Sequence, residues 1–106
     1  VDPKSEKAFK KGEKLKDKAI VVKIGWSTKP MDKFPDGIEA DKIQRVEYMI
    51  KDSKKFAATG GWGYARFVKT ADGSYRAWGG DANECYACHT AVADKDYLFS
   101  GYQNRF

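Results

Sequence analysis

The sequence has no long hydrophobic stretch. No apolar run exceeds about six residues, far fewer than the roughly 20 that a membrane-spanning helix needs, and the mean hydropathy is −0.70. It also shows no signal-peptide pattern, low-complexity segment, internal repeat or domain linker. We therefore expect a single domain over residues 1–106 that buries a modest core of its own and does not insert stably into a membrane.

Acidic residues are in the minority: 15 Asp and Glu stand against 20 Lys and Arg, giving a formal net charge of +5. Seven lysines lie within the first 18 residues, with Glu6, Glu13 and Asp17 interspersed among them. Such a segment could attract an acidic partner or an anionic membrane, but the mixed charges favour a solvated helix face. No nucleic-acid-binding motif accompanies the charge, so we expect no nucleic-acid partner.

Cysteine and histidine are scarce, and their positions are informative. The chain has two Cys and one His, all within the five residues Cys85-Tyr86-Ala87-Cys88-His89. This is the CxxCH pattern of c-type haem attachment. Two thiols three positions apart on a helical turn can add to the two vinyl groups of one porphyrin edge, and the next imidazole can then ligate the iron. We expect one covalent haem c, bound through Cys85 and Cys88, with His89 as iron ligand.

A zinc site, a redox-active dithiol and a structural disulfide fit this cluster less well. A structural zinc site needs four ligands, and the chain offers three. A thioredoxin-like CxxC belongs to a βαβ unit, whereas the surrounding pattern indicates antiparallel strands. A disulfide between residues three apart would be strained and would close a negligible loop.

Haem c has consequences for location and for iron coordination. Its covalent attachment takes place outside the cytoplasm, so we expect an exported, periplasmic protein whose signal peptide has been removed. No second imidazole is available for the sixth iron position. That position is therefore empty, water-bound, or filled by Met31, Met49, Lys23 or a partner's side chain.

The residue pattern predicts an α+β fold, mainly an antiparallel β-sheet with an N-terminal helix and a C-terminal haem-binding helix. Its late CxxCH and strand-rich middle argue against the all-helical cytochromes c and c′. The predicted elements begin with a helix over 6–15, for which Asp2 or Ser5 is the N-cap. A strand over 19–26, a loop over 27–41, strands over 42–51 and 62–69, and a short strand over 75–78 follow. The last element is a helix of about ten residues that is capped by Asp81 and includes 85–92.

Alternation within residues 42–51 assigns side chains to opposite faces of the predicted strand. One face carries Ile43, Arg45, Glu47 and Met49, and the other carries Val46, Tyr48 and Ile50.

Several segments, taken in order, resemble the cytochrome P-460 family, which includes the related cytochromes c′-beta. They are residues 1–5, the strand IVVKI with Lys23, residues 51–56 followed by Gly61-Trp62, and residues 96–99 after CYACH. The resemblance covers essentially the whole chain. It implies an antiparallel sheet with a few helices, a five-coordinate haem, and pairing as a homodimer, or as a heterodimer if another chain completes it.

The resemblance also implies nitrogen-oxide chemistry. In cytochromes P-460 a lysine is cross-linked to the porphyrin and the enzyme oxidises hydroxylamine, passing electrons to a redox partner cytochrome. Lys23 takes the cross-linking position, and Glu47 takes that of a carboxylate that handles protons on the distal side. In cytochromes c′-beta no cross-link forms, and the protein binds nitric oxide.

Both residues could also have ordinary structural roles. Lys23 could extend from a sheet edge into solvent, and Glu47 could pair with Arg45 or a lysine on a solvated face.

Family members usually have a further strand and a distal arginine before the point matching Val1, which this chain lacks. We expect either a short variant completed by a partner or a fragment. The missing arginine weakens the enzyme hypothesis. Simple electron transfer, with Met31 or Met49 as sixth ligand, stays open as an alternative.

Aromatic residues and one methionine are candidates for the haem pocket, although ordinary core or surface packing is the better explanation for each. The pocket candidates are Trp26, Met31, Phe34, Tyr48 and Phe67. Near the C-terminus, Tyr97, Phe99 and Tyr102 are expected to fold back beneath the proximal face.

Overall fold

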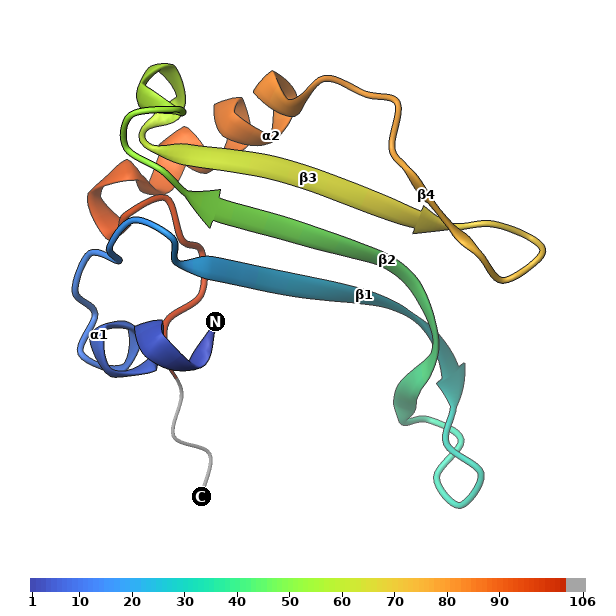
Figure 1. Cartoon of the computed structure of the whole chain (residues 1–106). Helices are drawn as coiled ribbons and strands as arrows, with labels where there is room; N and C mark the ends of the chain where they lie inside the picture. Colours follow the sequence, from blue (N-terminus) through green and yellow to red (C-terminus); the bar gives the residue numbers. More distant parts are fainter. Residues whose placement is uncertain (103–106) are drawn as a thin grey trace.

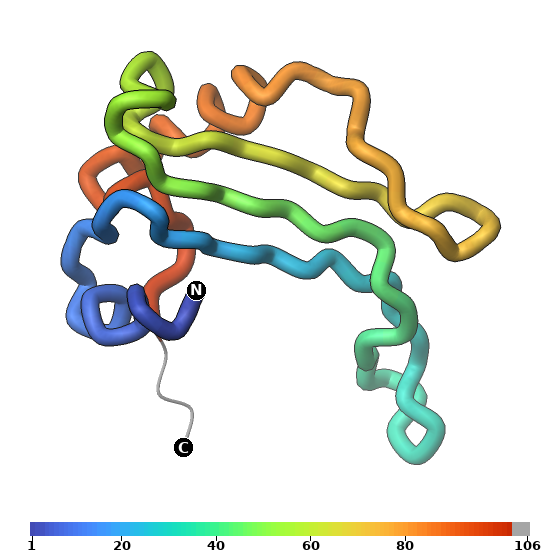
Figure 2. Tube along the Cα trace, viewed as in Figure 1, coloured from blue at the N-terminus to red at the C-terminus, as the bar shows by residue number. Residues whose placement is uncertain are grey.

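The computed structural model describes residues 1–102, and Figures 1 and 2 show its trace. The elements in chain order are the 3₁₀ turn η1 (Pro3–Ser5), helix α1 (Glu6–Lys10), strands β1 (Ile20–Pro30) and β2 (Ile38–Lys51), the 3₁₀ turn η2 (Ala57–Thr59), strands β3 (Trp62–Lys69) and β4 (Tyr75–Ala77), helix α2 (Ala82–His89) and the 3₁₀ segment η3 (Thr90–Lys95). The predicted α+β class, with a sheet between an N-terminal and a C-terminal helix, is confirmed.

The four strands form one antiparallel sheet in the order β1-β2-β3-β4. β1 and β2 are longer than predicted, because much of the expected loop over 27–41 pairs across the hairpin. Lys29 lies opposite Glu39 and Pro30 opposite Ile38, and only 31–37 form the turn. Pro30 is accommodated because it ends an edge strand, where its missing N–H breaks no sheet hydrogen bond.

Helix α1 ends at Lys10 rather than near Leu15, where the sequence pattern predicts its end. Gly12 adopts a left-handed backbone conformation, with φ of 70°. Its N–H donates to the Phe9 carbonyl at 3.1 Å, and the next N–H donates to the Ala8 carbonyl at 3.0 Å. These two bonds form a Schellman motif, which ends a helix. The chain can therefore turn and place Leu15 in the core.

Ser5 occupies the N-cap position of α1 and Asp2 that of η1, as predicted, but neither side chain makes a capping hydrogen bond. The Asp2 carboxylate instead accepts a hydrogen bond from the Ile20 N–H at 2.9 Å. The Asp2 N–H donates to the Ile20 carbonyl, also at 2.9 Å. These bonds join the N-terminus to the start of β1.

The core lies at one end of the sheet, where β1 and β3 begin and β2 ends (Figure 1). Its buried members are Leu15, Ala19, Met49 and Trp62. Partly buried hydrophobic residues around it come from α1, the strands and the C-terminal segment, and they are Ala8, Phe9, Val21, Tyr64, Tyr97 and Leu98. Trp62 is fully buried. The core thus packs both ends of the chain against the same end of the sheet.

The rest of the sheet extends away from this core. The radius of gyration is 16.0 Å, compared with about 13 Å expected for a compact chain of this length. Much of the sheet surface is consequently uncovered in the single chain. Across residues 1–102, no helix has the length and apolar character needed to cross a membrane.

Replacing Trp62 with alanine tests the position of the core. We expect the free energy of unfolding to fall by about 3–5 kcal/mol, because the substitution leaves a cavity under the strand ends. Urea denaturation followed by circular dichroism measures the change. Trp26→Ala is the matched control, because Trp26 is 47% exposed and should lose less than about 1 kcal/mol. Equal losses in the two variants would contradict this location of the core.

Candidate functional site

Helix α2 brings both cysteines and the histidine together. The helix begins after Asp81, whose carboxylate accepts a hydrogen bond from the Asn83 N–H at 2.9 Å, so the predicted N-cap is confirmed. Cys85 and Cys88 lie one helical turn apart as free thiols, one half-buried and the other exposed. The helix is shorter than expected. It ends at His89, and the 3₁₀ segment η3 follows.

The His89 imidazole is held by the segment that follows η3. Its Nδ1 lies 2.7 Å from the Tyr97 carbonyl oxygen. A carbonyl only accepts hydrogen bonds, so Nδ1 carries a proton, and Nε2 is the nitrogen that holds the lone pair in the neutral ring that ligates a metal. The ring packs against Tyr64 and Phe99, with ring centroids 5.2 Å and 4.8 Å away. His89 is therefore oriented as a ligand whose free nitrogen is Nε2.

The expected packing of the C-terminal aromatics is confirmed for two of the three. The Tyr97 carbonyl binds His89, and the Phe99 ring stands edge-on to the imidazole. Tyr102 instead lies near α1, where the Lys10 ammonium is 5.0 Å from its ring centroid.

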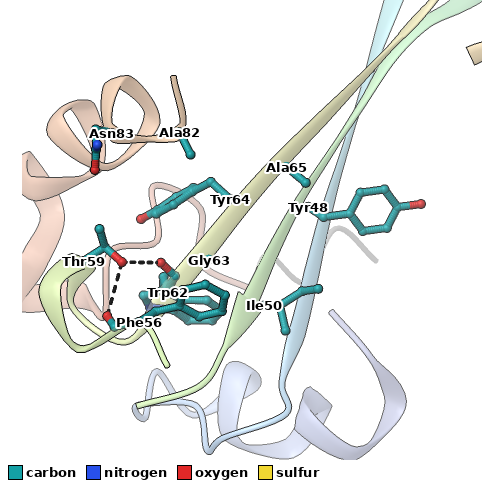
Figure 3. Close-up of a pocket in the computed structure, with 10 residues that line it drawn as sticks. All are labelled: Tyr48, Ile50, Phe56, Thr59, Trp62, Gly63, Tyr64, Ala65, Ala82 and Asn83. Atoms are coloured by element: carbon teal, nitrogen blue, oxygen red, sulfur yellow. Dashed lines mark hydrogen bonds between the residues drawn. The ribbon is translucent and has the colours of Figure 1, made fainter. Parts of the chain in front are cut away.

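Tyr64 is a neighbour of His89 that the sequence did not single out. It extends from β3 toward α2 and lines a pocket of about 260 Å³ at the edge of β3 (Figure 3). Burial and the nearby Cys85 thiol raise the pKa of its phenol, so the hydroxyl stays protonated. Within the described residues this buried hydroxyl has no hydrogen-bond partner. Buried polar groups rarely stay unpaired, so a group outside the chain is expected to complete this region.

These features fit a c-type haem. Two thiols one helical turn apart, an imidazole with a free Nε2, and an unpaired hydroxyl beside them form a suitable donor set. Among residues 1–102, no three or more His, Cys, Asp or Glu side chains are gathered to hold a metal ion by themselves.

Glu47 lies at the centre of a charged cluster on the sheet. It is opposite Lys23 on β1 and opposite Arg66 on β3. Its carboxylate is 3.3 Å from the Lys23 ammonium, 3.3 Å from Arg45 Nε and 2.8 Å from Arg66 Nε. Burial raises the pKa of Glu47, but these cations, Lys23 foremost, outweigh burial and lower it overall. The carboxylate is therefore ionised at neutral pH.

The charged cluster and His89 lie on the same face of the sheet. Arg66 pairs with Glu47, and Tyr64, two residues earlier on β3, packs against His89. Residues two apart on a strand point to the same face. The predicted pairing of Glu47 with Arg45 or a lysine is present. The side chain of Lys23 is 70% exposed, and its link to a haem stays a prediction.

Arg66 was missing from the predicted site. Its guanidinium lies between Glu47 and the Trp78 ring, whose centroid is 4.6 Å away. The backbone N–H of Trp78 also donates to the Arg66 carbonyl at 2.8 Å, which continues the pairing of β3 with the chain beyond the end of β4. Only the strand register places Arg66 opposite Glu47, and a single sequence does not contain that register.

Two of the predicted pocket residues lie on the other face. Tyr48 and Phe67 form an edge-to-face pair with centroids 5.9 Å apart. They belong to the alternate set of β2 and β3 positions, opposite to the set of Glu47 and Tyr64. Strand alternation directs both rings away from His89, although Tyr48 also lines the pocket of Figure 3 together with Tyr64. Their contact with a haem stays a prediction.

The remaining predicted pocket and ligand residues lie far from His89 or in the core. Met31 and Phe34 belong to the hairpin turn, where both pack around Gly37. Trp26 is largely exposed at an irregular part of β1. Met49 is 8% exposed in the core, so its use as an iron ligand would require that core to open.

Comparison with known proteins identifies a family. The family model described as Cytochrome P460 matches residues 1–100, nearly the whole chain. A search of curated proteins returned no match.

Glu47→Gln should show a pH-dependent loss of stability. At pH 7 we expect a loss of about 1–3 kcal/mol, because three cations lose their shared charged acceptor. The folded pKa of Glu47 lies below its ordinary 4.5. Its contribution is therefore complete above pH 4.5 and disappears as the pH falls through the lower, folded value. Urea titrations between pH 7 and pH 3 should show the two proteins converging.

Glu39→Gln is the control for this measurement. Glu39 makes an exposed cross-strand pair with Lys29 at 3.6 Å, and its loss should change stability by less than about 1 kcal/mol. A gap between the original protein and Glu47→Gln that stays constant with pH would contradict the account of Glu47.

Proposed function

We propose that this chain, which belongs to the cytochrome P460 family and is a mono-haem cytochrome, binds nitric oxide or oxidises hydroxylamine at an open iron position. The observation that carries the proposal is the orientation of His89. Its Nδ1 donates to the Tyr97 carbonyl, which leaves Nε2 as the free imidazole nitrogen. The sequence contains no second histidine to ligate iron from the opposite side.

Three residues of α2 would hold the haem. Cys85 and Cys88 would form its two thioether bonds, and His89 Nε2 would ligate the iron. When bound, the haem supplies an iron that binds small nitrogen oxides and exchanges electrons. The Tyr97 carbonyl fixes the imidazole by accepting a hydrogen bond from its Nδ1–H, and Tyr64 and Phe99 pack on the ring.

Glu47 distinguishes the two activities. Nitric oxide binding needs an open iron position alone, whereas hydroxylamine oxidation also needs a group that accepts protons and an electron acceptor. Three cations lower the pKa of Glu47, which makes its carboxylate a weak base. If Lys23 lost its charge by bonding to the porphyrin, one of those cations would disappear and the basicity of Glu47 would increase. Lys23 modification and proton acceptance are therefore coupled.

Location and electron partner follow from the same proposal. Covalent haem attachment supports assembly in the periplasm or an equivalent compartment. Turnover of hydroxylamine would also require a separate acceptor, such as another cytochrome, because one haem cannot store the electrons released.

Mass spectrometry and visible spectroscopy test this function on protein produced with c-type haem maturation. We expect one covalent haem and a high-spin ferrous spectrum that changes when nitric oxide is added. Digestion shows whether the Lys23 peptide stays on the porphyrin, which would favour hydroxylamine oxidation. A low-spin spectrum with a methionine-to-iron band would favour electron transfer instead. A chain without haem would overturn the proposal.

Lys23→Arg separates the cross-linked form from the open one. If Lys23 bonds to the porphyrin, we expect the Lys23→Arg protein to lose any red shift of the Soret band and to lose hydroxylamine oxidation by at least about tenfold, because arginine cannot form that bond. Lys29→Arg is the matched control, since Lys29 also pairs with a glutamate across β1 and β2. An unchanged spectrum in Lys23→Arg, with no hydroxylamine oxidation by either protein, would assign the protein to the gas-binding branch.

We also propose that two copies pair through the face of the sheet opposite His89. The apolar side chains on this face are each 36–46% exposed, and they are Ile20, Val22, Ile24, Ile50 and Phe67. A contiguous apolar surface of this kind is typical of an interface. It carries no charge among these positions, so a second copy related by twofold symmetry could pair with it.

Val22→Lys tests the pairing. Light scattering after size exclusion should give the mass of a monomer for this variant and of a dimer for the original protein, because the lysine would be buried without a partner. Thr28→Lys, on the same strand but outside the apolar patch, should stay dimeric. A monomeric original protein would refute this interface.

A further inference from the structure

We propose that the buried ion pair between Lys51 and Asp96 is a positioning device for the haem-ligating histidine. This inference rests on the proposed haem site. It concerns two residues whose observed side-chain hydrogen bonds and ion pair involve neither the cysteines nor the imidazole. They act through the Tyr97 carbonyl, which follows Asp96 directly in the chain and accepts the His89 Nδ1 hydrogen bond at 2.7 Å.

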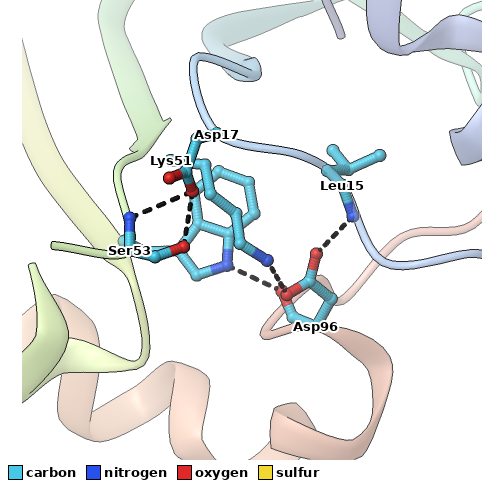
Figure 4. A network of polar contacts seen from close by, with 6 residues as sticks. Leu15, Asp17, Lys51, Ser53 and Asp96 are labelled. Carbon is cyan, nitrogen blue, oxygen red and sulfur yellow. Dashed lines mark hydrogen bonds and ion pairs between the residues drawn. The ribbon is translucent and has the colours of Figure 1, made fainter.

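The pair is the centre of a buried polar network (Figure 4). The Lys51 ammonium binds one carboxylate oxygen of Asp96, and the Leu15 N–H donates to the other at 2.8 Å. The Trp62 indole N–H donates to the Asp96 backbone carbonyl at 3.0 Å. Asp96 is therefore fixed through both its side chain and its backbone, by residues from three distant parts of the chain.

Lys51 is itself firmly placed. It is the last residue of β2 and lies opposite Trp62 in the sheet. Its N–H donates to the Ala19 carbonyl at 2.9 Å, and its carbonyl accepts from the Lys18 N–H at 2.7 Å. The ammonium thus projects from a rigid point of the sheet, and Asp96 is held relative to that point.

The turn that the pair holds has an unfavourable backbone conformation. Asp96 and Tyr97 both have positive φ, 55° and 62°, which residues other than glycine rarely adopt. Such conformations persist where surrounding contacts fix them. Here the contacts are the bonds to Asp96, the Tyr97 N–H bond to the Val92 carbonyl at 3.0 Å, and the Tyr97 ring packed over Gly60. The result is a carbonyl aimed at His89.

Stability alone is a poor explanation for this pair. Its side chains are 10% and 8% exposed, whereas those of the Lys29–Glu39 pair are 49% and 42% exposed. Burying two charges loses most of their hydration, so a buried pair often adds little net stability. The Lys51–Asp96 pair does, however, fix the position of the Asp96 side chain relative to the end of β2. Its position one residue before the carbonyl that orients His89 indicates a role in that orientation.

The expected consequence is an effect on the reduction potential of the iron and on the strength of its bond to His89. A histidine that donates its second N–H to a firmly held carbonyl is a more basic ligand, which favours ferric over ferrous iron. Weakening that bond should therefore raise the reduction potential and lower the frequency of the iron–histidine stretching band. Neither readout depends on turnover.

Lys51→Met gives the sharpest test in the haem-loaded protein. Removing a positive charge would by itself lower the potential, so a rise identifies the positioning effect. We expect the ferrous-to-ferric ratio at fixed solution potential to increase about tenfold, equivalent to about 59 mV. The iron–histidine band in the resonance Raman spectrum should fall in frequency. Lys29→Met is the control, because it removes the same charge from an exposed pair and should leave the Raman band unchanged.

Two further variants keep the inference testable if Lys51→Met does not fold. Asp96→Asn retains an oxygen that can accept from the Leu15 N–H, and it should lower the same Raman band. The double variant Lys51→Met with Asp96→Asn removes one charge of each sign, so a rise in its potential cannot come from net charge.

The outcomes separate this inference from the proposed function. A haem-loaded chain in which all three variants lose stability but keep the potential and Raman band of the original protein would overturn the positioning role alone. An original chain that binds no haem would overturn both proposals.

Discussion

Burial of Trp62 is the constraint on which the rest of the structure depends. Its ring is fully buried where β3 begins, and its indole N–H reaches the carbonyl of Asp96, 34 residues later. One side chain therefore joins the sheet to the segment that orients His89. Because the core contains only three other buried hydrophobic residues among those described, this tryptophan supplies a large share of the apolar contact that holds the two ends of the chain on the sheet.

The parts of the site that lie within one local segment could be predicted from the sequence. Cys85, Cys88 and His89 fall within five residues, so their spacing already places them on one helical turn, and Asp81 is a typical cap before them. The strands could be located from their β-branched residues. Arg66 could not be assigned, because its place beside Glu47 depends on the register between β2 and β3.

The remaining differences between sequence pattern and fold have similarly physical causes. The end of α1 depends on a left-handed Gly12, and the length of the hairpin depends on pairing between residues 27–30 and 38–41 that lack a strong strand pattern. The Lys51–Asp96 pair joins residues 45 positions apart. No spacing rule relates such positions, so contacts of this kind become visible only when the chain is folded.

The open shape of the chain follows from the division of the sheet into two unlike faces. One face carries Glu47 with its three cations and packs against α2, while the other carries exposed apolar side chains. The described helices are too short to cover both faces of this sheet, because α1 has five residues and α2 has eight. The large radius of gyration therefore has two separate origins. Among the described residues, the face beside His89 has a buried Tyr64 hydroxyl that still lacks a partner, whereas the exposed apolar side chains of the other face would be stabilised by another apolar surface. The proposed haem and the proposed second copy meet these two requirements on opposite sides of the same strands, so occupation of one does not obstruct the other.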